Sequence, residues 1–180
     1  MGSWYAGRGL AQQARIAYEN TLRLSPNLAL AYSNLAFIYA YYGISSDWAG
    51  QAQSAIRVDP SFLGGYLSLA GVLYREGQMS DAIAVMQKTV TNHPDVAHAH
   101  AFLGELLLAE GRLDEAQSAI EKAVQIAPHD PEFYAAAAKV HYYRKDYARA
   151  LRYAEQARAM GLNHHIVFLM LKRDPRVRAK

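Results

Sequence analysis

Apolar residues recur along this chain at the spacing of one helix face, in short segments separated by turn residues. Between 29 and 42, Tyr32, Leu35, Ala36 and Tyr39 follow the i, i+3, i+4, i+7 spacing that forms one apolar stripe on a helix. The same spacing returns three times: at Tyr66, Leu69, Ala70 and Leu73; at His100, Leu103, Gly104 and Leu107; and at Tyr134, Ala137, Ala138 and His141. Each segment is followed by a second one of similar length. The pattern predicts pairs of helices joined by short turns.

The pairs repeat with a fixed period. Prolines at 26, 60, 94 and 128 are 34 residues apart, and glycines at 9, 43, 77 and 111 keep the same step. A proline disfavours helix at the residue before it, and glycine suits a helix end, so these positions mark unit boundaries and turns. A period of this length is typical of a helical solenoid. The predicted units are 29–62, 63–96, 97–130 and 131–162, in a single domain spanning 1–173.

The two ends depart from the regular unit. Aligned by Pro26, residues 1–28 form a partial repeat that begins inside a first helix, with Ala11 to Leu24 as its second helix. After Gly161, Asn163 is expected to cap a short apolar helix over 164–173 that seals the last repeat. The alternative is an interaction helix that contacts a partner or a membrane. Residues 174–180 are expected to be a frayed basic tail.

Small and large residues alternate where the two helices of a unit should cross. Small residues recur on the first helices (Ala36, Ala70, Gly104 and Ala138) and on the second helices (Ala14, Ala82, Ala116 and Ala150). One unit differs, because Trp48 takes the small position and Ala52 takes the bulky one, a helical turn later. We interpret this exchange as a local repacking that conserves volume. The alternative is a Trp48 exposed to a partner.

These recurring positions resemble the tetratricopeptide repeat over about residues 11–162. The resemblance implies an all-α fold, a right-handed α-solenoid of helix-turn-helix repeats with a C-terminal capping helix. It also implies a protein–protein interaction scaffold whose first helices line a concave groove. Carried over residue by residue, the groove positions expected to bind a partner are Asn34, Phe37, Tyr41, Tyr74, Arg75, His98, Phe102, Glu105, Lys139 and Tyr142. The carboxylate clamp of chaperone-binding members and the asparagine ladder of the glycosyltransferase members are absent, since only Asn34 matches either pattern.

Composition narrows the possible functions. Apolar residues make up 52% of the 180 residues and charged residues 19%, which indicates a folded chain. Residues 172–180 alone carry +4, and the whole chain has a net charge of +3, so the rest is close to neutral and no basic face for nucleic acid is expected. There is no cysteine, no His-Glu-x-x-His pattern and no Ser-His-Asp set, so we expect no catalysis, no cofactor and no metal ion.

The resulting hypothesis is a non-catalytic scaffold that binds a partner peptide or helix in an apolar, aromatic groove. The alternatives are an assembly subunit that binds or self-associates through its solenoid ends, notably the incomplete first repeat, and the repeat portion of a larger enzyme. No apolar run spans a bilayer, and no charged-then-apolar leader begins the chain. A cytoplasmic location is therefore expected, or a periplasmic one if a signal peptide has been removed.

Overall fold

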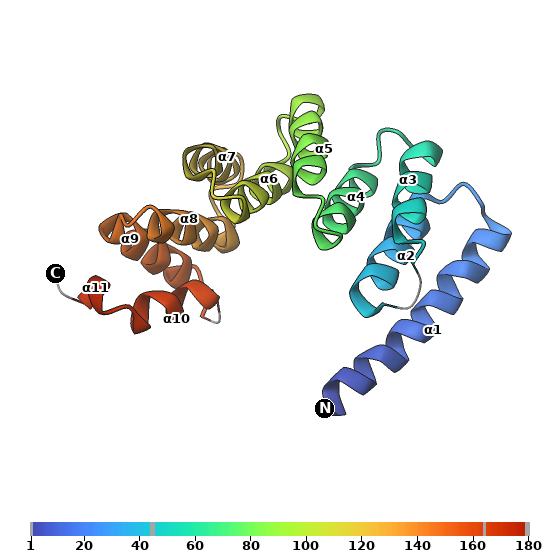
Figure 1. The fold of residues 1–180 in the computed structure, drawn as a ribbon, viewed down its shortest axis with the longest axis horizontal. Coiled ribbons are helices and arrows are strands. Elements are labelled where there is room, and N and C mark those ends of the chain that lie inside the picture. The colour runs from blue at the N-terminus through green and yellow to red at the C-terminus, as the bar shows by residue number, and fades with distance from the viewer. Residues whose placement is uncertain (1, 44–45, 164, 179–180) are drawn as a thin grey trace. The chain divides into compact units, whose positions relative to one another are not determined.

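The computed structural model describes residues 2–43, 46–163 and 165–178. These residues form helices and their connections, so the predicted all-α architecture of helix-turn-helix repeats is confirmed (Figure 1). The helices are α1 (Gly2–Leu24), α2 (Ala29–Tyr42), α3 (Trp48–Val58), α4 (Leu63–Arg75), α5 (Met79–Asn92), α6 (Ala97–Ala109), α7 (Leu113–Ile126), α8 (Pro131–Tyr143), α9 (Tyr147–Ala159), α10 (Ile166–Arg173) and α11 (Pro175–Arg178).

The chain divides into two units, residues 1–89 and 90–180, with the boundary inside α5. In the first unit α2 packs against α1, α3 and α4, and α3 also packs against α4. In the second unit α6 pairs with α7 and α8 pairs with α9, while α7 and α8 join the two pairs. Neighbouring helix pairs thus cover apolar surface that a single pair could not bury alone, as expected for stacked repeats.

The turns between paired helices share one backbone conformation, a residue in the left-handed region after the first helix. Gly77, in the left-handed region at φ 78°, donates its N–H to the Tyr74 carbonyl, and Gln78 N–H donates to the Leu73 carbonyl. This arrangement satisfies carbonyls that the end of a helix leaves unpaired. Lys145 adopts the same left-handed conformation, with φ 64°, at the turn where the period supplies no glycine. The left-handed turn conformation is therefore kept where the glycine is missing.

The predicted crossing positions lie at the centres of the helix pairs. Ala36, Ala70 and Ala138 are fully buried on the first helices, and Ala82 and Ala116 are fully buried on the second helices. At Gly104 on α6 the fit is so close that an added Cβ would lie 2.6 Å from Ile120 Cγ1 and 3.2 Å from the Ala116 carbonyl oxygen of α7. Close approach of the two backbones explains why small residues recur there.

Trp48 and Ala52 are arranged as the repacking interpretation expects. Ala52 is fully buried, and Trp48 is half-buried against the cluster that Ala11, Leu35 and Ile38 form. The indole N–H of Trp48 donates a hydrogen bond to Glu76. The large ring therefore fills space inside the first unit, where it also has a polar partner.

At the N-terminus the prediction of two helices is wrong. One continuous helix, α1, runs through Gly9, where the aligned period suggested a turn. A polar network ties this helix to the next one, because Arg15 on α1 pairs with Glu19, which accepts the Tyr39 hydroxyl of α2 at 2.8 Å. Burial, followed by the Glu19 carboxylate, raises the pKa of Tyr39 to about 12, so the hydroxyl stays a donor.

At the C-terminus α10 packs on α8 and α9, as predicted for a capping helix. The predicted cap residue is wrong, because His165 caps α10 instead of Asn163 and accepts the Val167 N–H on Nδ1 at 3.2 Å. The frayed tail is also wrong for the described residues up to 178. Asp174 and Val177 are buried, and Val177 joins the apolar cluster of α9 and α10.

Candidate functional site

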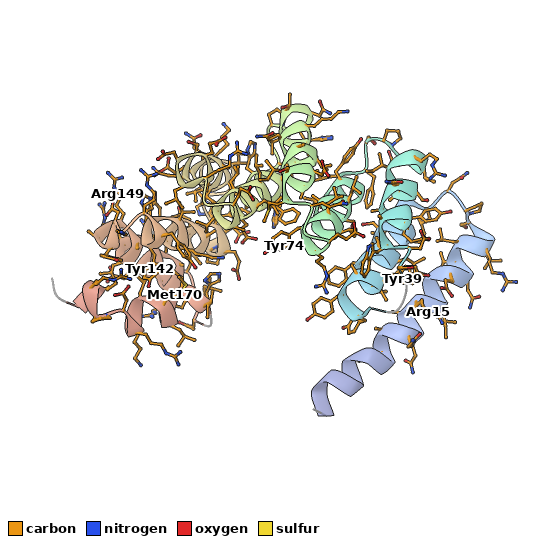
Figure 2. All side chains as sticks on the ribbon, viewed as in Figure 1. Arg15, Tyr39, Tyr74, Tyr142, Arg149 and Met170 are labelled. Atoms are coloured by element: carbon orange, nitrogen blue, oxygen red, sulfur yellow. The ribbon has the colours of Figure 1, made fainter. Side chains whose placement is uncertain are left out.

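Large aromatic side chains gather on the exposed side of the first unit. Phe37 is 60% exposed, Tyr41 58% and Tyr74 45%, although each is large and largely apolar. The Phe37 and Tyr41 rings stack with centroids 5.5 Å apart, and the Arg75 guanidinium carbon lies 5.9 Å from the Tyr41 centroid. We call Phe37, Tyr41, Tyr74 and Arg75 the aromatic face. Figure 2 shows Tyr74 on α4, in the first unit.

This arrangement brings together three of the predicted site residues, Phe37, Tyr41 and Arg75, and Tyr74 is exposed next to Arg75 in the chain. Phe37 and Tyr41 are one turn apart on α2, and Arg75 reaches them from the end of α4. Clustered exposed rings are unusual on a protein surface and mark interaction sites, because their burial removes apolar area from water. Tyr42, which sequence reasoning did not single out, supports Tyr41 edge-on with centroids 4.9 Å apart.

A short polar seam fixes α2 against α4. Ser33 Oγ lies 2.7 Å from Ser68 Oγ and donates to the Gly64 carbonyl at 3.0 Å. Ser33 is buried and Ser68 is half-buried, and each hydroxyl has a hydrogen-bond partner in the seam. The seam holds in place the two helices that carry the aromatic face.

Asn34 has a structural partner rather than a free amide. Its Nδ2 donates to the Tyr18 hydroxyl of α1 at 3.1 Å. The amide therefore links α1 to α2.

The other five predicted residues lie in the second unit, and they do not form a comparable cluster. His98 packs edge-on against Phe133 with centroids 5.1 Å apart, Phe102 and Lys139 are half-buried, and Glu105 is exposed. The hydroxyl of Tyr142 donates to Asp174 Oδ2 at 2.8 Å. That hydrogen bond raises the pKa of Tyr142, and it commits the hydroxyl to the C-terminal segment.

The described residues contain no group of three or more His, Asp or Glu side chains arranged to hold a metal ion. Among the same residues, no helix has the length and hydropathy needed to cross a bilayer.

Comparison with known proteins places the repeats in a family. The family model for the tetratricopeptide repeat matches residues 73–140 and, in a second overlapping placement, residues 107–164. No curated protein matches this sequence.

Solved structures with the same fold share about a fifth of their residues with this chain. A thermophilic TPR protein of Thermus thermophilus is 19% identical, with a TM-score of 0.78 over 94% of this chain and 92% of that one. PilF of Pseudomonas aeruginosa is 19% identical, with a TM-score of 0.75 over 93% and 77%. YrrB, described as a TPR protein with an unusual peptide-binding site, is 21% identical, with a TM-score of 0.65 over 94% and 87%.

The matched residues cover half of the chain, and the helix pairs repeat at the period of that family model. The chain therefore belongs to the tetratricopeptide repeat family, whose repeats serve in general as non-catalytic scaffolds for protein–protein interaction.

Proposed function

We propose that this protein binds an apolar segment of a partner protein on the aromatic face of its first unit. The observation that carries the proposal is the exposure of Phe37, Tyr41 and Tyr74, three large rings on two helices that the Ser33–Ser68 seam holds together. Burying such rings against a partner releases about 25 cal/mol for each Å² of apolar surface removed from water.

The chemistry of the face suggests the kind of segment it takes. The stacked rings of Phe37 and Tyr41 offer a flat apolar surface, and Arg75 adds one positive charge beside it. A segment with one or two large apolar side chains and a nearby carboxylate complements both features. YrrB, which shares the fold at 21% identity, is described as having a peptide-binding site, and this description supports a peptide segment as the partner.

Display of a random peptide library provides the test. The affinity of peptides selected on the wild-type protein is then measured for the Phe37→Asp variant, which replaces one of the two stacked rings with a charge. We expect affinity to fall at least about tenfold, because an anchor ring at the centre of an interface carries more than about 1.4 kcal/mol of the binding free energy.

The matched control is Tyr143→Asp, because Tyr143 is an aromatic residue that is 50% exposed and lies on α8, outside both the aromatic face and α1. This variant should bind the selected peptides as the wild type does. Equal binding by Phe37→Asp and the wild type would show that the face is not the binding surface.

A second candidate, assembly through the first helix, rests on the outer side of α1. Leu10, Ala17 and Leu24 are exposed and seven residues apart, which places them on one stripe of the helix. Such a stripe suits pairing with another helix, from a second copy of the chain or from another subunit. In that case Leu10→Glu lowers the molar mass or complex size measured by sedimentation, and Phe37→Asp does not.

A further inference from the structure

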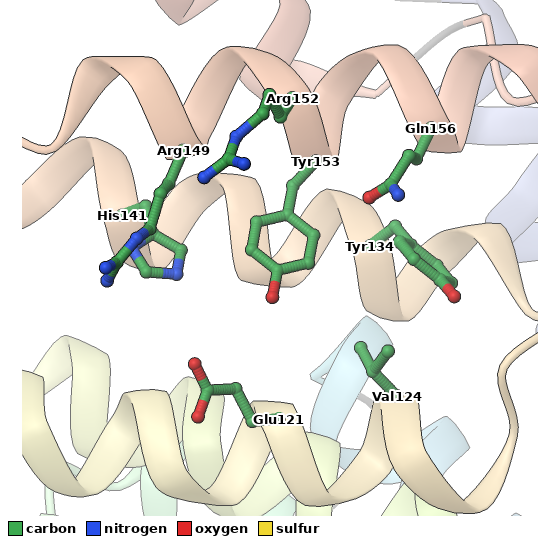
Figure 3. Close-up of a pocket in the computed structure, with 8 residues that line it drawn as sticks. All are labelled: Glu121, Val124, Tyr134, His141, Arg149, Arg152, Tyr153 and Gln156. Atoms are coloured by element: carbon green, nitrogen blue, oxygen red, sulfur yellow. The ribbon is translucent and has the colours of Figure 1, made fainter.

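A cavity of about 590 Å³ opens in the second unit, between α7 and α9, the second helices of the last two repeats. Its walls come from three helices, with α9 on one side, α7 on the other and α8 between them (Figure 3). The volume falls in the range of pockets that hold small molecules. The cavity is bounded by charged and aromatic side chains, so its chemistry differs from that of the aromatic face.

Opposite charges face this cavity from opposite walls. Arg149 and Arg152 extend from α9, while Glu121 lies on α7 across the cavity (Figure 3). Among the described residues neither guanidinium forms an ion pair with Glu121, and Arg152 forms no hydrogen bond at all. Arg149 is only weakly engaged, since its Nε lies 3.4 Å from Asp146 Oδ2. Donors are therefore available on the α9 wall. On the α7 wall one oxygen of Glu121 is available, because the other accepts a hydrogen bond from Gln117 Nε2 at 2.8 Å.

A buried polar atom at the same cavity lacks a partner. His141 on α8 is 1% exposed, and its Nδ1 has no hydrogen bond within the described part of the chain, with the Asp146 carboxylate 4.0 Å away. A buried ring nitrogen without a partner costs free energy, and such groups in native proteins call for an explanation. Burial lowers the pKa of His141, so the ring is neutral near pH 7 and leaves both arginines as the cationic groups of the site.

Apolar surface lies between the charged walls. The Tyr153 ring stacks on the His141 ring with centroids 5.3 Å apart and lies 6.2 Å from the Tyr134 ring, and Val124 lines the cavity from α7. A flat ring packs well on this surface, because aromatic rings gain from offset stacking beyond the area they bury.

We propose that this cavity binds a small zwitterion with an aromatic group, namely an aromatic α-amino acid. Its carboxylate pairs with Arg149 and Arg152, its ammonium pairs with Glu121, and its ring packs on Tyr153 and Val124. A simple anion uses only the arginine wall and is opposed by Glu121, so the zwitterion is the better match to the charges present.

Three probes that differ by one charged group test this assignment by calorimetric titration. They are L-phenylalanine, 3-phenylpropionate, which lacks the ammonium, and L-phenylalaninamide, which lacks the carboxylate. The wild type should bind phenylalanine most tightly, by about tenfold over either analogue, because each analogue loses one charge-assisted contact. Absence of saturable phenylalanine binding, or equal binding of the three probes, would overturn the proposal.

Two variants test the contributions of the arginine wall and the Glu121 wall separately. Arg152→Gln should weaken phenylalanine and 3-phenylpropionate alike, by about tenfold. Glu121→Gln should weaken phenylalanine but leave 3-phenylpropionate unchanged or tighter. Arg57→Gln serves as control, because Arg57 is an exposed arginine on α3 in the other unit. The proposal fails if Arg152→Gln binds as the wild type does, or if Arg57→Gln loses as much; far-UV circular dichroism verifies the helical fold of each variant.

Discussion

Single residues decide how closely the helices of this protein approach one another. At Gly104 the backbone of α7 and the Ile120 side chain occupy the space that a Cβ would need. At Gly9 nothing lies within 4 Å of the position of a Cβ, and the residue sits inside α1. Two glycines of the same 180-residue chain therefore have different surroundings, one packed and one open.

Alanine at these two positions should change stability in opposite directions. Gly104→Ala forces Ile120 to shift in a packed pair, which costs about 2 kcal/mol of unfolding free energy. Gly9→Ala meets no neighbour and removes the entropy that glycine loses in a helix, which stabilises by about 0.5–1 kcal/mol. Urea unfolding followed by circular dichroism measures both. Stabilisation by Gly104→Ala would contradict the close approach of α6 and α7.

The buried ring of His141 leads to a second prediction, which concerns the pH dependence of folding stability. Its pKa is lowered mainly by burial, while Asp146 acts in the opposite sense and Arg149 in the same sense. The unfolded state then binds a proton more readily than the folded state. Stability is complete above the unfolded pKa of about 6.5 and is lost as pH falls from there toward the folded pKa.

His141→Phe keeps a ring stacked on Tyr153 and removes the titrating nitrogen. The melting temperature of this variant should therefore fall less between about pH 7.5 and about pH 5.5 than that of the wild type. His129→Gln provides the control, because His129 lies in the loop between α7 and α8, away from the His141 ring, and should leave the acid sensitivity unchanged. A His141→Phe variant as acid-sensitive as the wild type would exclude His141 as a source of that sensitivity.

At the scale of helices, the period accounts for most of the fold. The prolines and glycines that repeat every 34 residues coincide with the ends of helices from α2 onward, and the small crossing residues lie where the helices meet. These features could be predicted because they depend on local backbone preference and on contacts within a pair. The apolar stripe at 29–42 likewise predicted α2, and the family pattern selected Phe37 and Tyr41, whose side chains are exposed in the structure.

The ends could not be predicted in this way, because they depend on contacts outside the repeat. A turn at Gly9 needs a neighbour against which the chain can fold back, and the open surroundings of Gly9 show none, so the helix propagates. Asp174 is ordered by Tyr142 and Arg176, which pair with it at 2.8 and 2.6 Å. The sequence pattern shows the charged residues of that segment but not the partner 32 positions earlier.

The Tyr142–Asp174 hydrogen bond should hold the C-terminal helices on the last repeat. Tyr142→Phe removes the hydroxyl that donates to Asp174. We expect amide exchange across α10 and α11 to become about tenfold faster, which corresponds to a loss of about 1.4 kcal/mol in the free energy of local opening. Hydrogen–deuterium exchange read by mass spectrometry resolves this segment. Tyr143→Phe is the matched control, since Tyr143 is the next residue and is exposed. Equal exchange in the two variants would show that this bond does not hold the segment.

At the scale of the whole molecule, the two proposals for partner binding predict different behaviour in solution. If the aromatic face carries the function, the chain sediments as a monomer and Phe37→Asp leaves its sedimentation coefficient unchanged. If the outer stripe of α1 carries it, the wild type self-associates or requires a partner subunit, and Leu10→Glu alters the distribution. We expect the first result, because α2 and α4 expose three large aromatic rings, whereas the α1 stripe consists of two leucines and an alanine. A dimer that Leu10→Glu dissociates would favour the second.

The most direct test of the aromatic face is a chemical-shift map of the wild-type protein with a peptide selected on it. We predict that the largest amide shifts fall in α2 and α4, around Phe37, Tyr41 and Tyr74, and that Phe37→Asp abolishes them. Shifts confined to α1 near Leu10 and Leu24, or to the second unit, would contradict the assignment of partner binding to this face.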